Sequence, residues 1–257
     1  MGTVTLPLIH GQGTPETVWR EWLTGQRFPF ADLTFLVPLG SRLVVVAPHP
    51  DDEILACGGL LAACVQSRTP VRVIALSDGD ASHGTDDPLA MRQLAVQRRV
   101  ESCAGLRVLG LAACHVVCWH IPDGHVRQYQ DQITKAMIRL LQPLDVVVTP
   151  WAMDGHPDHD AAGDAASAAC SAVGCAVLQA PVWMWHWATP GDARVPWSQM
   201  VALKTSPAAV ELKQQALACH RSQLLPAVQG QAPILNAAIC ARALWPVEYF
   251  FVRGAAA

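Results

Sequence analysis

A short polar segment that directly follows an apolar run most limits how this chain can fold. The run 43–47 is rich in β-branched residues, the hexapeptide Pro48-His49-Pro50-Asp51-Asp52-Glu53 comes next, and residues 54–61 are again largely apolar. A β-branched run, a turn bracketed by prolines and a buried helix are typical of the opening of an α/β unit. Ligands of open α/β sheets bind just beyond the carboxyl ends of the strands. The hexapeptide therefore lies where a binding site is expected.

A second polar cluster follows another apolar run about a hundred residues further on. The segment Asp154-Gly155-His156-Pro157-Asp158-His159-Asp160 comes shortly after the run 145–150. The carboxyl ends of parallel strands lie at one edge of a sheet, so the two clusters can meet there. This arrangement predicts one shared site.

The pattern predicts an α/β fold with a mostly parallel sheet and helices on both of its faces. Strands are expected at 42–47, 71–76, 115–119, 145–149, 175–178, 182–187 and 201–204. Helices are expected at 16–23, 54–66, 89–108, 129–141, 159–173 and 207–221. We interpret residues 1–257 as a single domain, with residues 1–40 as an N-terminal extension packed on it.

Three alternating tryptophans, Trp183, Trp185 and Trp187, fall in the expected strand 182–187. Alternation would place all three on one face of that strand. Two interpretations are open for this face. A sugar ring can stack on one of the indoles, or all three can pack in the core or in an interface, which is the favoured interpretation.

Composition indicates a heavily buried chain without a nucleic-acid partner. Apolar residues make up 51% and charged residues 15%, which favours either a subunit interface or a hydrophobic groove and leaves homo-oligomerisation open. The net charge is −3 and there is no basic stripe for nucleic acid. We expect no signal peptide and no membrane span, and the nine scattered cysteines suit a reducing cytoplasm.

The two clusters contain the residue types of a metal-assisted hydrolase. His49, Asp52 and His159 would form a set of two histidines and one carboxylate, which suits zinc and leaves a fourth position open for water. Zinc lowers the pKa of its bound water to about 7. Asp51 could take the proton of that water, and His156 could polarise a carbonyl oxygen and donate a proton.

The expected cofactor is one Zn²⁺ per chain, although iron or cobalt would also fit these ligands. Asp158 could hold His156 in its charged form. Taken alone, the hexapeptide could instead be a capped helix start. A second His-Pro-Asp-His segment at a similar strand end favours a shared site over the interpretation as a helix start alone.

These residues resemble the LmbE-like (PIG-L) family of zinc-dependent N-deacetylases, over roughly residues 42–252. The paired motifs carry the resemblance, and intermediate features agree with it: Ser77-Asp78-Gly79, Arg98 with Glu101, and Pro122-Asp123-Gly124. The resemblance implies a Rossmann-like fold and removal of acetyl groups from N-acetylglucosamine units of small-molecule glycoconjugates.

The resemblance also implies roles for individual residues. The implied metal ligands are His49, Asp52 and His159, and the implied general base is Asp51. His156 would stabilise the oxyanion or act as the acid, with Asp158 as its partner. Arg98 and Asp123 fall where the family has motif residues near the pocket, which suggests substrate binding, although Arg98 could pair with Glu101 along its own helix.

Some features depart from the family pattern or leave other functions open. The first 40 residues are extra, and His220-Arg221-Ser222-Gln223 either lines the pocket or seals the domain. An amidase that removes a larger acyl or thiol-conjugate group would use the same centre. A metal-dependent sugar-binding protein would not need a base, and a closed structural metal site would need a fourth protein ligand.

Overall fold

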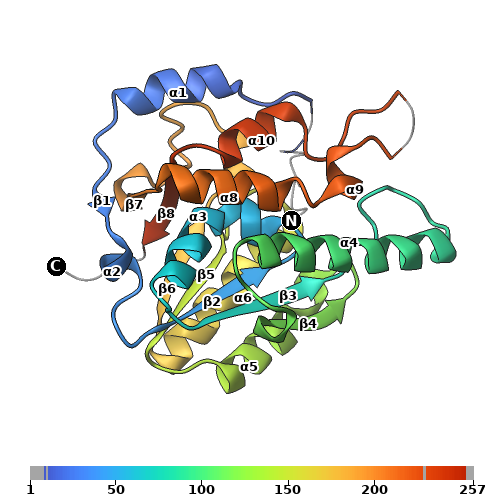
Figure 1. Cartoon of the computed structure of the whole chain (residues 1–257), viewed down its shortest axis with the longest axis horizontal. Coiled ribbons are helices and arrows are strands. Elements are labelled where there is room, and N and C mark those ends of the chain that lie inside the picture. The colour runs from blue at the N-terminus through green and yellow to red at the C-terminus, as the bar shows by residue number, and fades with distance from the viewer. Residues whose placement is uncertain (1–8, 10, 228–229, 253–257) are drawn as a thin grey trace, which may run out of the picture.

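The computed structural model describes residues 9, 11–227 and 230–252, and within these residues one eight-stranded mixed sheet forms the centre of the fold (Figure 1). The spatial order is β1-β7-β8-β6-β5-β2-β3-β4. In chain order the strands are β1 Phe30–Ala31, β2 Arg42–Ala47, β3 Val71–Ser77, β4 Val116–Ile121, β5 Asp145–Pro150, β6 Ala176–Ala180, β7 Met200–Lys204 and β8 Val247–Val252. Only β8 runs antiparallel to its neighbours, so the predicted mostly parallel α/β fold is confirmed.

Helices cover both faces of this sheet. Their bounds are α1 Glu16–Thr24, α2 Leu33–Leu36, α3 Asp52–Gln66, α4 Pro88–Val108, α5 Gln130–Leu140, α6 Pro157–Val173, α7 Met184–Trp187, α8 Pro207–Leu217, α9 Arg221–Leu224 and α10 Ala237–Ala243. One core cluster contains buried side chains of α3, α4 and α8, and a second contains those of α5 and α6. The small alanines of α6 let this helix pack closely on the sheet.

The order of the strands explains where the two polar clusters lie. The chain passes from β2 to β3 and β4 on one side, and then returns to β5, which pairs with β2 in parallel. The register pairs Leu43 with Val146 and Val45 with Val148. The strand order therefore reverses between β2 and β5, which is the usual place for a ligand in such a sheet. The segments after β2 and β5 meet there.

The expected strand 182–187 is wrong. The Asp154 carboxylate accepts hydrogen bonds from the backbone N–H groups of Val182, Trp183 and Met184, and the short helix α7 follows. The alternating tryptophans consequently share no strand face. Strand β8, by contrast, forms in a tail to which the sequence pattern gave no element.

The described part of the N-terminal extension packs on the domain through aromatic side chains. Trp19 of α1 is fully buried, and its Nε1 donates a hydrogen bond of 2.7 Å to the Trp185 carbonyl. Its ring also meets those of Trp22 and Trp197. The parts of the predicted domain at 1–8, 10, 228–229 and 253–257 lie outside the described residues.

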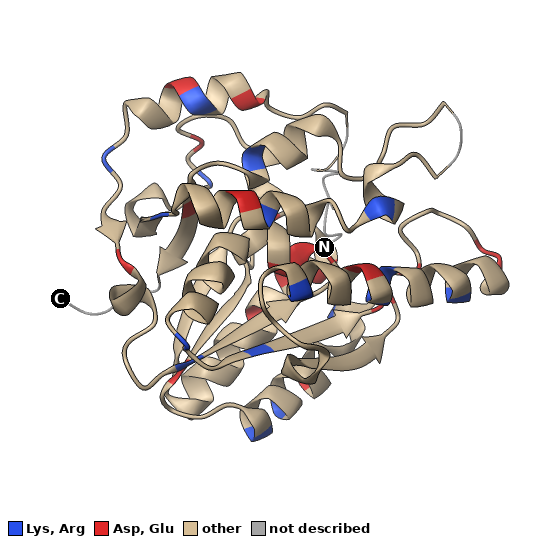
Figure 2. Ribbon diagram, in the orientation of Figure 1, with Lys and Arg blue, Asp and Glu red and all other residues tan. Residues whose placement is uncertain are grey.

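Charged residues are sparse on the ribbon, and an acidic group lies near the centre of the fold, where α3 begins (Figure 2). Asp52 and Glu53 belong to the first turn of α3, and both are buried. In the described part of the chain, every helix is too short or too polar to cross a lipid bilayer.

Candidate metal centre

Three predicted metal ligands converge at the junction of β2 and β5. His49 follows β2, Asp52 begins α3, and His159 lies in the first turn of α6. Asp52 Oδ2 is 3.2 Å from His49 Nδ1 and 3.2 Å from His159 Nε2. One ligand atom from each residue lies within 4.8 Å of the others, so a single ion can contact all three.

The second ring nitrogen of each histidine faces a carboxylate. His159 Nδ1 is 2.8 Å from Asp154 Oδ2, and His49 Nε2 is 3.1 Å from Asp123 Oδ1 and 3.3 Å from Asp158 Oδ2. Histidines that bind metal usually donate this second N–H to a carboxylate or a carbonyl. His159 Nε2 itself is buried, and although Asp52 Oδ2 lies 3.2 Å away, none of the described residues forms a well-aligned hydrogen bond with it. These donors fit a borderline divalent cation such as zinc.

A neighbouring group of His49, Asp123 and Asp158 also has the spacing to hold a metal. Its two carboxylates, however, already have backbone partners. Asp158 accepts hydrogen bonds from the N–H groups of Gly124 and Val126, at 2.8 and 3.0 Å, and Asp123 accepts one from Ala81. Asp52 of the first group likewise accepts the His49 N–H at 2.9 Å, so backbone hydrogen bonds do not separate the two groups.

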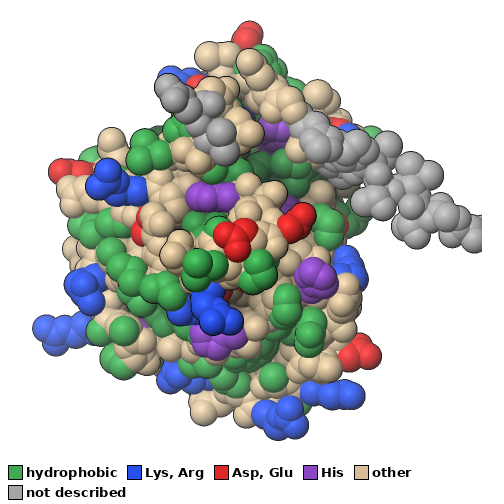
Figure 3. Space-filling model, turned by 90° about the vertical axis from the view of Figure 1, so that its right-hand side faces the viewer, with side chains coloured by type: hydrophobic (Ala, Val, Ile, Leu, Met, Phe, Trp, Pro, Cys, Tyr) green, Lys and Arg blue, Asp and Glu red, His purple; other side chains and the backbone are tan. Residues whose placement is uncertain are grey.

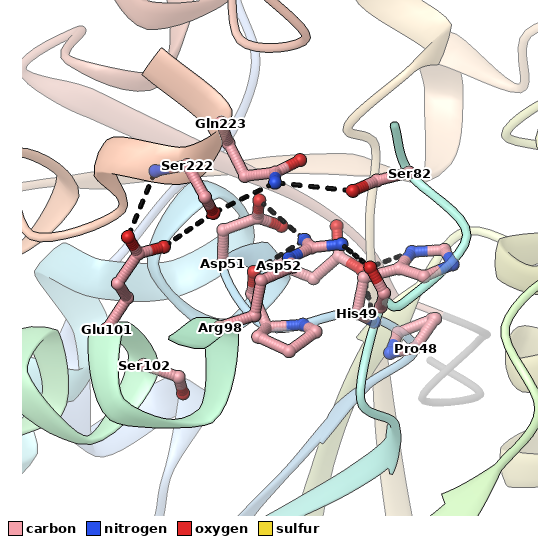
Figure 4. Close-up of polar contacts among 12 residues, drawn as sticks. Pro48, His49, Asp51, Asp52, Ser82, Arg98, Glu101, Ser102, Ser222 and Gln223 are labelled. Carbon is pink, nitrogen blue, oxygen red and sulfur yellow. Dashed lines mark hydrogen bonds and ion pairs between the residues drawn. The ribbon is translucent and has the colours of Figure 1, made fainter. Parts of the chain in front are cut away.

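Asp51, the predicted base, lies beside this centre in an unusual backbone conformation. Its φ is 131°, which an L-residue other than glycine rarely adopts. The Asp51 N–H donates to Glu53 Oε2 at 3.1 Å. Arg98 donates to the Pro50 carbonyl at 2.9 Å and to Asp51 Oδ2 at 3.1 Å, and Figure 4 shows the contact between Arg98 and Asp51. Strain of this kind persists where surrounding contacts enforce it, and it is common at active sites.

The Arg98 side chain binds residues outside its own helix, α4, and does not pair with Glu101. It is 3% exposed, and it donates to Asp51 and to the carbonyls of Pro50 and Gly79, while Glu101 binds Ser222 instead. A Cβ at Gly79 would collide with the guanidinium group, so only glycine fits there. Arg98 also lines the pocket, but its contacts indicate that it mainly orients Asp51.

Burial raises the pKa of the Asp51 carboxyl to about 7, while the Arg98 cation opposes that rise. A general base works best when its pKa lies near the working pH. The environment of Asp51 therefore suits proton transfer near neutrality.

The surroundings of His156 favour its neutral form, while Asp158, the predicted partner of its charged form, acts in the opposite direction. Burial, followed by the neighbouring imidazoles of His159 and His49, lowers the pKa of His156 to about 3. Its Nδ1 accepts the backbone N–H of Asp158 at 3.2 Å, so the ring proton lies on Nε2. The Asp158 carboxylate is bound by Gly124, Val126 and His49 instead.

A pocket of about 500 Å³ opens over these residues. Its polar lining side chains are those of His49, Asp51, Asp52, Ser82, Arg98, Asp123, His156 and Gln223. Its larger apolar lining side chains are those of Ile9, Leu55, Pro157, Trp183, Ile234 and Leu235. Figure 3 views the molecule from the side toward which β2 and β3 point, and histidine and hydrophobic side chains lie together on that face.

Of the three alternating tryptophans, Trp183 alone lines this pocket, and its ring stacks near His156 with centroids 6.3 Å apart. Trp185 is in the aromatic core with Trp19. Trp187 lies beside Trp151 and donates from Nε1 to the Asp154 carbonyl.

Sequence reasoning missed Asp154 as a site residue. It is fully buried, and its carboxylate binds His159 as well as three backbone N–H groups. Its place five residues before His159, in an acidic and histidine-rich segment, was the available signal. Its partners at 182–184 could not be read from the local pattern.

The fold and this geometry define an α/β protein with a candidate metal centre of two histidines and one aspartate at the sheet's carboxyl edge. Residues 44–170 match the model of the PIG-L family, described as GlcNAc-PI de-N-acetylase. Over this stretch, about half of its length, the chain is similar to the PIG-L, or LmbE-like, family.

Two relatives and one solved structure illustrate the similarity. A diacetylchitobiose deacetylase of Thermococcus kodakarensis is 26% identical over 48% of this chain and 46% of that protein. A 1D-myo-inositol 2-acetamido-2-deoxy-alpha-D-glucopyranoside deacetylase of Tsukamurella paurometabola is 28% identical over 84% of this chain and 94% of that protein. The N,N'-diacetylchitobiose deacetylase of Pyrococcus horikoshii shares the fold, with a TM-score of 0.53, 22% identity and coverage of 80% and 77% of the two chains.

The match spans about half the length of the first of these relatives, at 46%.

Proposed function

We propose that this protein is a zinc-dependent deacetylase that hydrolyses the acetamide of an N-acetylglucosamine-type sugar conjugate. One observation carries the proposal: the ligand atoms of His49, Asp52 and His159 converge within 4.8 Å, and the buried carboxyl of Asp51 lies in the same pocket. The named activities of the relatives support the choice of substrate class.

His49, Asp52 and His159 would hold the ion through two imidazole nitrogens and one carboxylate oxygen. When bound, zinc supplies a water of lowered pKa and polarises a carbonyl oxygen. The histidines are kept in the required orientation by Asp154 on one side and by Asp123 and Asp158 on the other.

Asp51 removes a proton from the attacking water, since its pKa of about 7 lets it hold that proton near neutrality. Arg98 fixes the carboxylate for this task. The Nε2–H group of the neutral His156 donates a hydrogen bond to the developing oxyanion. The proton on Asp51 then passes to the amine as the C–N bond breaks, which releases acetate and the free amino sugar.

The test combines metal analysis with acetate release. We expect about one zinc per chain in the purified protein. We also expect acetate release from N,N'-diacetylchitobiose or methyl N-acetylglucosaminide that a chelator abolishes and added zinc restores. A protein that binds no metal after reconstitution, or that binds metal without releasing acetate from any such glycoside, would contradict the proposal.

The apolar side chains that line the pocket favour a second candidate, an amidase for a larger acyl group. Leu55, Trp183 and Leu235 offer a surface that an acetyl group alone would not need. A panel of N-acyl glucosaminides from acetyl to octanoyl separates the two. A rate that falls with chain length supports the deacetylase, and a rate that rises supports the amidase.

We further propose that the protein works in the cytoplasm. All nine cysteines are free, which suits a reducing compartment. A reducing fractionation of the source cells, followed by detection of the protein in the cytosolic fraction, tests this location.

A further inference from the structure

Helix α9 carries a glutamine that the proposed reaction does not use. Gln223 is fully buried and lines the pocket together with Asp51 and Arg98. Its Nε2 donates to Ser222 Oγ at 3.0 Å and to Ser82 Oγ at 3.3 Å (Figure 4). The side chain is therefore fixed from two elements, α9 and the loop after β3.

The hydrogen-bond network determines which end of the amide is free. Glu101 offers only acceptors, and the Ser222 hydroxyl donates its single proton to Glu101 Oε2 at 2.6 Å. Ser222 Oγ can therefore only accept from Gln223, so the NH₂ group must face Ser222. A flipped amide would place two acceptors against each other.

The oxygen of this amide is left without a partner. Among the described residues no donor reaches Gln223 Oε1, although the atom is buried. An unpaired buried acceptor is unfavourable unless a ligand or an ordered water supplies the missing donor. Three carboxylates also line this pocket, those of Asp51, Asp52 and Asp123, and they too accept hydrogen bonds.

We propose that Gln223 Oε1 accepts a hydrogen bond from a ring hydroxyl of the sugar and is a specificity-determining residue. This inference rests on the proposed function, because it takes an amino sugar as the ligand. A sugar offers hydroxyl donors that fit a fixed acceptor, whereas an apolar ligand would leave the oxygen unpaired. Loss of the contact should affect recognition of one hydroxyl rather than the chemistry at the metal.

The experiment is a cycle of variants and substrate analogues with the zinc-loaded enzyme. Methyl N-acetylglucosaminide and its 3-, 4- and 6-deoxy analogues are compared in wild-type protein, Gln223→Met and Gln97→Met. Gln97 is the matched control, because it donates to the same Glu101 but is exposed and lies outside the pocket.

We expect Gln223→Met to lower kcat/KM for the parent glycoside at least about tenfold, mainly through KM. One deoxy analogue should already be poor for the wild type and lose nothing further in the variant. Gln97→Met should behave like the wild type. If Gln223→Met folds poorly, as its thermal unfolding would reveal, Gln223→Asn retains the amide and should give the same pattern with a smaller loss.

Equal losses for the parent and all three analogues, with acetate still released by the wild type, would overturn the role of Gln223 while leaving the deacetylase intact. No acetate release by the wild type from any of these glycosides would overturn the proposed substrate class and this inference with it.

Discussion

Asp51 combines a strained backbone with a buried carboxyl, and both depend on its neighbours. Its φ of 131° is held by Glu53 at the N–H and by Arg98 at the side chain and at the preceding carbonyl. The sequence could suggest that Asp51 is chemically important, because it follows a strand in a cluster of ligands. It could not reveal the partnership with Arg98, which lies 47 residues away in the sequence.

Replacement of Asp51 by Asn tests the base at nearly constant shape. The amide cannot take a proton from water, so we expect kcat to fall by about 10²–10⁴-fold while about one metal ion per chain is retained. Elemental analysis and acetate release measure the two effects. Near-normal turnover would rule out Asp51 as the base.

Asp154→Asn tests the carboxylate behind His159. The change weakens the bond to His159 Nδ1, at present 2.8 Å long, so we expect metal affinity to fall by about 10–100-fold. Competition with a colorimetric zinc chelator measures the affinity. Asp192→Asn, on an exposed loop and paired with Arg194, is the control and should bind zinc like the wild type. Unchanged affinity in Asp154→Asn would show that the carboxylate serves α7 alone.

At the level of elements, α3 is two helical pieces joined at Cys57, where φ is −152°. A buried ion pair binds the backbone groups that this break exposes. Glu248 of β8 accepts from the N–H groups of Gly59 and Leu60, and Lys213 of α8 donates to the Leu55 carbonyl and to Glu248. These bonds connect α3, which begins with the proposed metal ligand Asp52, to β8 and α8.

Lys213→Met should be strongly destabilising, because it leaves Glu248 as an uncompensated buried charge. We expect the free energy of unfolding to fall by about 3–5 kcal/mol. Urea unfolding measures the change. Lys204→Met, on the exposed side of β7, is the control and should stay within about 0.5 kcal/mol of the wild type. A small effect of Lys213→Met would mean that solvent reaches the pair.

Most of the regular elements could be predicted from local pattern, because β2, β5 and α6 each have the periodicity and the end signals of their type. The segment 182–187 could not. Its alternating tryptophans imitate a strand, but the carboxylate of Asp154 captures three successive N–H groups and turns the chain into α7. A tertiary contact overrode the local signal.

At the level of the whole molecule, the buried His220 couples stability to pH. Burial, followed by the charge of Arg98, lowers the pKa of His220 to about 3. The unfolded chain would titrate near its ordinary value of about 6.5. Between these values the unfolded state binds one more proton, so stability is lost as the pH falls below about 6.5.

His220→Leu should remove this loss. Between about pH 7 and about pH 5, the wild type should lose about 2 kcal/mol more of its unfolding free energy than the variant. Urea unfolding at both pH values measures the difference, and the comparison cancels the other titrating groups. Parallel losses in the two proteins would show that His220 is not the responsible group.

The adjacency of β2 and β5 has a consequence for folding itself. An ion held by His49 and His159 joins segments that are far apart in the chain but follow neighbouring strands. A cation that binds only the folded protein acts by mass action, and at one hundred times its dissociation constant it adds about 2.7 kcal/mol to stability. The melting temperature should accordingly rise with zinc concentration in the wild type and stay level in His159→Ala, as calorimetry can measure. The same ion would then cross-link the two halves of the sheet. Loss of metal would lower the stability of the fold as well as stop the reaction.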